Sequence, residues 1–187
     1  MRKKTLIVLL ALGLSMFFTG GAQAASTGTW GSWTMYGQEK DSWCWAAATK
    51  SIIKKATGTT VSQCNIVKAG KNTTACANVG GSKSDYARAF SYYGVTPYTY
   101  TSGHPSWDHI RNLTLIGKGV IQGIKWTGTS TYHALPLIGT KVDGKKVYIV
   151  DIGLNTVEAK WTTYANLVAG NARLDSTFAP TNGWTNN

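Results

Sequence analysis

Apolar side chains in the first half of this chain recur every three or four positions, the spacing of one face of a helix. This spacing predicts four helices, at residues 42–57, 62–69, 84–93 and 106–118. Asp41 and Ser42 are expected to cap the first helix, because their side-chain oxygens can accept hydrogen bonds from its free amides. Gly58, Gly70 and Gly94 are expected to end the first three helices, since glycine readily adopts the left-handed conformation found there.

The second half alternates apolar and polar positions, which is the pattern of half-buried strands. Strands are predicted at residues 119–126, 132–139, 145–152 and 156–162, followed by a short helix at 164–168 and a last strand at 173–178. Asp143-Gly144 is a turn signal that joins the second and third strands as a hairpin. Helices followed by a mostly antiparallel sheet predict an α+β domain, with a helical N-terminal part and a β-sheet C-terminal part.

The first residues have the pattern of a secretory signal peptide. Arg2, Lys3 and Lys4 precede an apolar run over residues 6–18, and Ala22-Gln23-Ala24 has the small-x-small pattern of a cleavage site. The apolar run is shorter than the roughly 18–20 residues that a membrane-spanning helix needs. The sequence therefore predicts a signal peptide at 1–24 and one domain at 25–187, which is secreted, extracellular and not stably inserted in a membrane.

The chain is basic, with 19 Lys and Arg against 8 Asp and Glu and a formal net charge of +11. The basic residues are scattered and form no Arg-rich run, which argues against nucleic-acid binding. The simplest interpretation is a solvated basic surface on a monomer. Electrostatic association with anionic surfaces, such as cell-wall polymers or lipid headgroups, stays open as an alternative.

The chain contains three cysteines: Cys44, Cys64 and Cys76. In a secreted protein, two cysteines that lie close in sequence are expected to pair, which here predicts a Cys64–Cys76 disulfide. This pairing leaves Cys44 as a free thiol. The alternative is that Cys64 is a buried thiol in a helix and that no bridge forms.

Cys44 stands between two tryptophans at the start of the first predicted helix, six positions after Gln38. The thiolate is the nucleophilic form of cysteine, and the unpaired N–H groups of a helix N-terminus favour it. A thiolate, an imidazole and a nearby amide donor are the parts of a site that attacks carbonyl groups. The alternative is that Cys44 is only a small apolar residue in a tryptophan-lined core.

His133 is the histidine expected to partner the thiol. It is an isolated polar ring on an apolar strand, whereas His104 and His109 have the surroundings of a loop and a half-buried helix residue. Asp151 follows at the end of the next strand, so a hairpin brings it toward His133. The two residues lie at unequal distances from the turn, so the hairpin needs a bulge or a stagger. A satisfied core histidine is the alternative interpretation.

Gln38, Cys44-Trp45, His133 and Asp151, in this order and spacing, resemble the papain-like cysteine proteases. The resemblance is greatest to their compact bacterial branch, which includes secreted staphopain-like enzymes, effector proteases and double-glycine peptidases. It implies a two-part papain-like fold, a protein or peptide substrate and no cofactor. It also implies Cys44 as nucleophile, His133 as general acid and base, Asp151 as its orienting partner, and Gln38 with the Cys44 N–H as oxyanion hole.

The chain departs from the family pattern at three places. Asp151 replaces the asparagine of papain, although several bacterial relatives also use aspartate. Residues 39–43 replace the usual glycine-rich approach to the cysteine, and Ile152-Gly153-Leu154 replaces the usual residues after the carboxylate. No paired Cys or His spacing indicates a metal site. A transglutaminase-type acyltransferase and a secreted papain-fold toxin or binding protein remain alternative functions.

Overall fold

The computed structural model describes residues 32–96, 98–172 and 178–186. The predicted signal peptide and most of the predicted last strand lie outside these ranges. The described helices are α1 (Cys44–Thr57), α2 (Gln63–Lys71), α3 (Lys83–Tyr92), α4 (Trp107–Leu115), α5 (Tyr164–Val168) and the 3-10 turn η1 (Asp143–Lys145). The strands are β1 (Tyr98–Ser102), β2 (Val120–Trp126), β3 (Tyr132–Lys141), β4 (Lys146–Gly153), β5 (Thr156–Thr163) and β6 (Phe178–Asn186). The predicted α+β class is confirmed.

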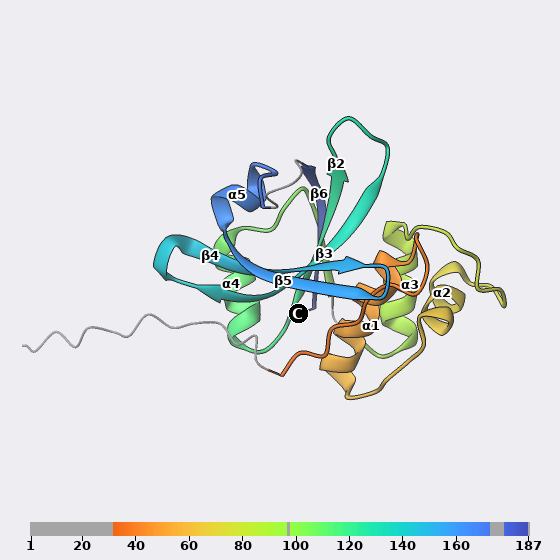
Figure 1. The fold of residues 1–187 in the computed structure, drawn as a ribbon. Helices are drawn as coiled ribbons and strands as arrows, with labels where there is room; N and C mark the ends of the chain where they lie inside the picture. Colours follow the sequence, from red (N-terminus) through yellow and green to blue (C-terminus); the bar gives the residue numbers. More distant parts are fainter. Residues whose placement is uncertain (1–31, 97, 173–177, 187) are drawn as a thin grey trace, which may run out of the picture.

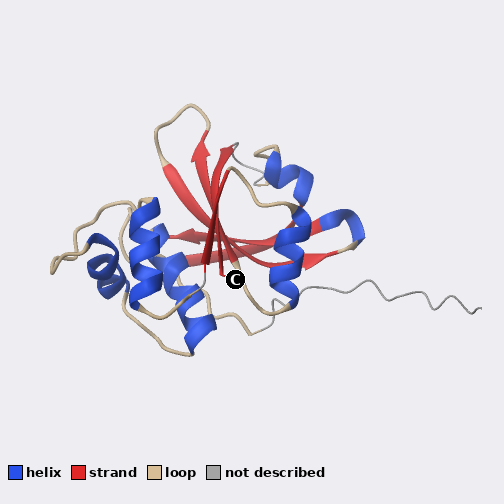
Figure 2. Cartoon of the chain, turned by 180° about the vertical axis from the view of Figure 1, so that it is seen from behind, coloured by secondary structure: helices blue, strands red, loops and turns tan. Residues whose placement is uncertain are grey.

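The strands form one sheet in the order β1-β6-β2-β3-β4-β5, and every neighbouring pair is antiparallel. Figure 1 shows α1, α2 and α3 on one side of this sheet. Figure 2, seen from behind, shows α4 and α5 on the other side. The N-terminal helical part thus packs against a sheet built almost entirely by the C-terminal half of the chain.

Both faces of the central strands are buried. Ile121, Ile138 and Val150 pack with α1, α2 and α3, whereas their neighbours Val120, Leu137 and Ile149 pack with α4 and α5. Successive side chains of a strand point to opposite faces, so burial on both faces demands consecutive apolar residues. This requirement explains the runs of Val, Ile and Leu in β2, β3 and β4.

Helix α1 begins at Cys44, two residues later than predicted. Asp41 and Ser42 do not cap it: the N-cap position is Trp43, which makes no side-chain capping bond. The Trp43 N–H instead donates to the Lys40 carbonyl, so residues 40–43 form a turn that precedes the helix. Gly58 ends the helix in the left-handed conformation, at φ 74°, as predicted.

Helix α2 continues through Gly70, so the prediction that this glycine ends the helix is wrong. Asn72 ends it, at φ 51°. A Cβ on Gly70 would lie 2.7 Å from the Trp45 ring, so the glycine serves close packing against α1. Gly94 follows α3 at φ 71°, as predicted, and α4 ends at Leu115, three residues earlier than predicted.

The sheet contains strand β1, which the sequence pattern did not predict, and strand β6, which meets the described part of the predicted last strand at Phe178. β1 pairs with β6, with Tyr100 opposite Trp184. The last strand begins at Phe178, where the predicted strand ended. Trp184 lies 5.1–5.5 Å, centroid to centroid, from the rings of Tyr86, Tyr98 and Tyr100, so an aromatic cluster stabilises this polar pair of strands.

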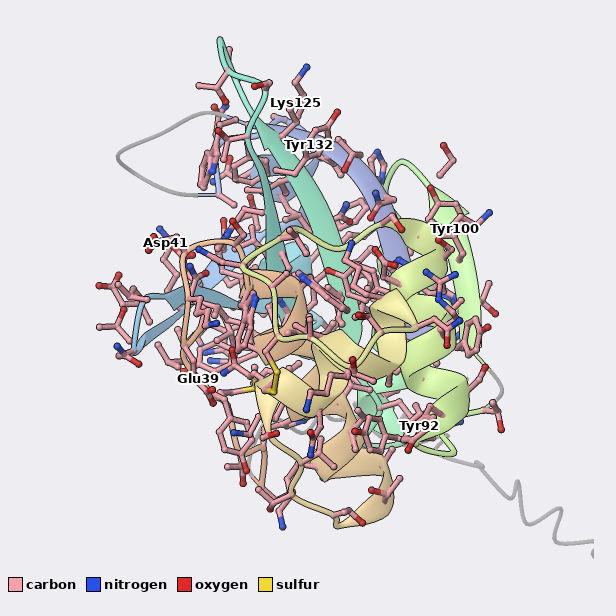
Figure 3. All side chains as sticks on the ribbon, turned by 90° about the vertical axis from the view of Figure 1, so that its right-hand side faces the viewer. Glu39, Asp41, Tyr92, Tyr100, Lys125 and Tyr132 are labelled. Atoms are coloured by element: carbon pink, nitrogen blue, oxygen red, sulfur yellow. A yellow bond between two sulfur atoms is a disulfide. The ribbon has the colours of Figure 1, made fainter. Side chains whose placement is uncertain are left out.

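The predicted disulfide is present between Cys64 and Cys76, and Cys44 is free. The disulfide joins α2 to the loop at residues 72–82; Figure 3 draws it as a yellow bond. The β3–β4 hairpin is also present, and its register shifts between Leu137 and Gly139, as the unequal spacing required. Among the described helices, none combines the length and apolar character needed to cross a bilayer.

Candidate active site

A cleft of about 680 Å³ opens where the start of α1 meets the sheet. Its walls include Gln38, Cys44, His133 and Asp151, so the structure brings all four predicted site residues together. The helical wall includes the segment before α1, the start of α1, the loop at 72–82 and one residue of α3. The sheet wall includes the adjoining parts of β2, β3, β4, β5 and β6.

Cys44 is the first residue of α1 and is half-buried, between the buried side chains of Trp43 and Trp45. The Trp43 indole N–H donates to the Ala77 carbonyl at 2.9 Å, and the Trp45 indole N–H donates to the Val79 carbonyl at 3.0 Å. These bonds hold the loop against the helix start on either side of Cys44. The first N–H groups of a helix have no partner within it, and their positive potential favours the thiolate.

His133 lies between the two walls. Its Nε2 is 2.8 Å from Oδ1 of Asp151, and Cys44 lines the same cleft, close enough to raise the pKa of the ring. Because Nε2 faces Asp151, Nδ1 is the nitrogen left for the thiol. Burial by itself lowers the pKa of His133, but the hydrogen bonds and charges of Asp151 and Cys44 outweigh it and raise the pKa to about 9. The ring is therefore an imidazolium at neutral pH.

Trp126, at the end of β2, stacks on the His133 ring with a centroid distance of 5.9 Å and an interplanar angle of 25°. The face of an indole attracts a cation, so this contact favours the imidazolium and fixes its plane. Trp126 was not among the site residues predicted from the sequence. The only signal in the sequence was an aromatic residue at the end of the predicted strand 119–126, which precedes the strand that carries His133.

Gln38 is held by its backbone and by its side chain. Its N–H donates to the Gly153 carbonyl at 3.0 Å, and the Asn155 N–H donates to the Gln38 carbonyl at 2.8 Å. The side-chain Nε2 donates to the Asp41 carbonyl at 2.8 Å, which fixes the orientation of the amide. An amide nitrogen carries two hydrogens, so the second N–H is left for the cleft, which Gln38 lines.

The other two histidines do not line the cleft. His104 Nδ1 is 3.0 Å from the Tyr164 hydroxyl, which donates to the Pro105 carbonyl. His109 is on α4, on the far side of the sheet from α1. Within the described part of the chain, no three His, Cys, Asp or Glu side chains group as metal ligands.

The loop at 72–82 forms part of a cleft wall, whereas the sequence pattern indicated only a connection between two helices. Gly80 and Gly81 both line the cleft, and a Cβ on Gly81 would overlap the Trp45 ring. Lys40 and Ser42 also bind this loop, through the Cys76 carbonyl and the Asn78 side chain. The loop therefore belongs to the site because of its tertiary contacts.

A comparison with protein families gives a match over most of the chain. The family described as "Papain-like cysteine protease AvrRpt2" matches residues 32–162, which is most of the chain and includes every residue of the site described above. Among curated proteins, none matches.

Proposed function

This chain belongs to the papain-like cysteine proteases and is therefore a hydrolase of peptide bonds, and from this premise we propose that it is a secreted endopeptidase that acts through a thioester on Cys44. Cys44 is the nucleophile and His133 the general acid and base. Asp151 orients His133. Gln38 and the Cys44 N–H form the oxyanion hole.

In the acylation step, the Cys44 thiolate attacks the carbonyl carbon of the substrate and forms a C–S bond. The carbonyl oxygen becomes an oxyanion, which accepts hydrogen bonds from the Gln38 side chain and the Cys44 N–H. The C–N bond then breaks as the His133 imidazolium gives its proton to the leaving amine. The products of this step are a thioester on Cys44 and a free amine.

In the deacylation step, neutral His133 takes a proton from water as the water oxygen attacks the thioester carbon. The C–S bond breaks, the carboxylic acid product leaves, and the thiolate–imidazolium pair is restored. Asp151 holds the ring through Nε2 in both steps, so the same Nδ1 faces the sulfur and the substrate.

One observation carries this proposal. His133 forms a hydrogen bond with the Asp151 carboxylate through Nε2 and shares one cleft with the free thiol of Cys44, which raises its pKa. A histidine that only filled the core would need neither partner. Secretion is supported separately, by the signal-like pattern at residues 1–24 and by a disulfide of the kind that persists in oxidising compartments.

The experiment is to express the full chain, recover the processed protein, and incubate it with an unbiased peptide library. Mass spectrometry should find internal cleavages that disappear in Cys44→Ala and after treatment with a thiol-alkylating epoxide. Arg111→Lys, a change on α4 outside the cleft, is the matched control and should cleave like the parent.

The same reactions should be run with an added primary amine. Incorporation of the amine at substrate glutamines, without hydrolysis of the peptide backbone, would support the transglutaminase-type alternative and contradict the proposal. Cleavage that survives in Cys44→Ala would contradict the assigned nucleophile.

A further inference from the structure

The charge of the cleft is opposite to that of the chain. Lys and Arg outnumber Asp and Glu by 19 to 8 in the sequence, yet none of the residues that line the cleft is Lys or Arg. Its charged residues, apart from His133, are Asp41, Asp151 and Glu158. An acidic cleft in a basic protein focuses a local negative potential that the surrounding surface does not have.

Asp41 and Glu158 have no basic partner among the described residues, and both are exposed to solvent. The carboxylates just outside the cleft differ, because Glu39 pairs with Lys50 and Asp85 pairs with Lys71. The charges of Asp41 and Glu158 therefore remain available to a ligand in the cleft.

The nearest lysine in sequence does not neutralise Asp41. Lys40 Nζ donates to the Cys76 carbonyl at 2.9 Å and lies 4.5 Å from the centre of the Trp43 ring. Its ammonium group therefore binds the loop at 72–82 and does not pair with Asp41. Figure 3 shows Asp41 on the segment before α1, away from Tyr92 and Tyr100 on the opposite side of the view.

Glu158 is a second source of negative charge in the cleft. It lies directly opposite Asp151 in the β4–β5 ladder, and like charges at directly opposed positions destabilise a sheet. Asp151 is already engaged with His133. The fold therefore places an additional negative charge beside the reacting groups without a structural partner that requires it.

We infer that the cleft selects substrates that carry a cationic side chain, Lys or Arg, close to the scissile bond, with Asp41 and Glu158 as the specificity-determining residues. This inference rests on the proposed peptidase function. The thiolate, Asp151, Asp41 and Glu158 outnumber the one imidazolium, so the reactive form of the site is anionic. Both carboxylates line the same cleft as Cys44, so a cation that binds them lies near the reacting bond.

The first test measures the charge preference without any substrate. Cationic, neutral and anionic methanethiosulfonates modify a free thiolate with release of methanesulfinate, and Cys44 is the one cysteine outside the disulfide. Rates are normalised to those of a small free thiol. We expect Cys44 to react about tenfold or more faster with the cationic than with the anionic reagent at low salt, and less selectively as salt rises.

Glu158→Gln and Asp41→Asn should each lower this ratio by about twofold to fivefold, the range expected of an exposed charge pair. Asp108→Asn is the matched control, because it removes an exposed carboxylate on α4 outside the cleft and should leave the ratio unchanged. A normalised ratio near one would overturn the inference. A high ratio that persists in both cleft variants would overturn the assignment of Asp41 and Glu158.

The second test uses peptides that differ only in lysine against norleucine at each position flanking the cleaved bond. The lysine peptide should have the higher kcat/KM at one or more positions, and the advantage should shrink in Glu158→Gln. Equal cleavage of both members at every position would overturn the inference and leave the peptidase function standing. Absence of all cleavage, with charge-selective labelling of Cys44 intact, would contradict the proposed function instead.

Discussion

The two walls of the cleft are held together by different kinds of bonds. The sheet wall, which carries His133 and Asp151, is fixed by backbone ladders and by burial of β3 and β4 on both faces. The helical wall, which carries Cys44, packs into the core through α1 and is further held by a disulfide and by side-chain bonds from two indoles to the loop at 72–82. The comparison indicates that His133 is positioned by strand pairing, whereas Cys44 is positioned by the burial of α1 in the core together with side-chain bonds to the loop.

Loss of the imidazole should have the largest effect, because it connects the two walls. His133→Ala should lower kcat/KM by at least the roughly 10²–10⁴-fold that general acid–base catalysis contributes. Asp151→Asn should lose less, because the amide oxygen can still accept from the ring N–H at Nε2. Steady-state kinetics with a cleaved peptide measure both variants, and thermal unfolding checks the fold. Equal and complete loss in both, with the fold intact, would mean that Asp151 is wrongly assigned.

Gln38→Ala should have the next largest effect. It tests the residue that links the segment before α1 to the β4–β5 turn. Removal of one oxyanion donor costs about 2.7–4 kcal/mol, or roughly 10²–10³ in kcat, with little change in KM. Alkylation of Cys44 by iodoacetamide should continue at nearly the parent rate, since the thiolate does not need the amide. If this variant cleaves peptides as the parent does, Gln38 is not the oxyanion donor.

Removal of the disulfide tests the helical wall alone. Replacing both Cys64 and Cys76 by serine should lower the free energy of unfolding by about 3 kcal/mol, the value expected for a short closed loop. Hydrogen exchange should quicken in the loop at 72–82 and at the start of α1, while β3 and β4 keep their protection. Equal acceleration in both walls would show that the two are one cooperative unit.

The pH dependence of stability should be comparable in size to the effect of the disulfide, and it involves one partner of His133 from each wall, Asp151 and Cys44. The pKa of His133 in the folded state is about 9, because Asp151 and Cys44 outweigh the opposing effect of burial. Since this value exceeds the unfolded value of 6.5, the folded protein keeps the proton between them. The stabilisation is complete below about pH 6.5 and is lost as pH rises through 9, by at most about 3 kcal/mol.

Denaturant titrations between pH 6 and 10 measure this loss, with His133→Gln as the control that should flatten the difference. Blocking Cys44 with a small alkyl group should lower the His133 pKa, which NMR of the ring protons can follow. A pKa that does not change after blocking would assign the whole effect to Asp151.

The sequence predicted those parts of the molecule that depend on local pattern. Helix α1, the strands β2 to β5 and the bulged β3–β4 hairpin follow from periodicity and turn residues, and the Cys64–Cys76 disulfide follows from spacing. The pairing of β1 with β6 could not be predicted in this way, because Tyr100 and Trp184 are far apart in the sequence and no local pattern indicates that they pair. Gly70 was misinterpreted for a similar reason, since its neighbour Trp45 comes from another helix.

The candidate site likewise contains residues that the sequence could identify and residues that it could not. Gln38, Cys44, His133 and Asp151 were identified from residue type and order, and the structure brings them to one cleft. Trp126 and Glu158 were not identified, because an aromatic residue or a carboxylate at a strand position has no distinctive signal. Their relevance comes from register: Trp126 stacks on His133, and Glu158 faces Asp151.

The backbone bridge between Gln38 and the β4–β5 turn has a mechanical consequence. It joins the segment before the nucleophile helix to the strand that carries Asp151, at the base of the cleft. A segment tied to a neighbouring strand by backbone hydrogen bonds can shift little relative to that strand. Gln38 would therefore keep a constant position relative to the strand that carries Asp151 while the substrate carbonyl reacts near Cys44.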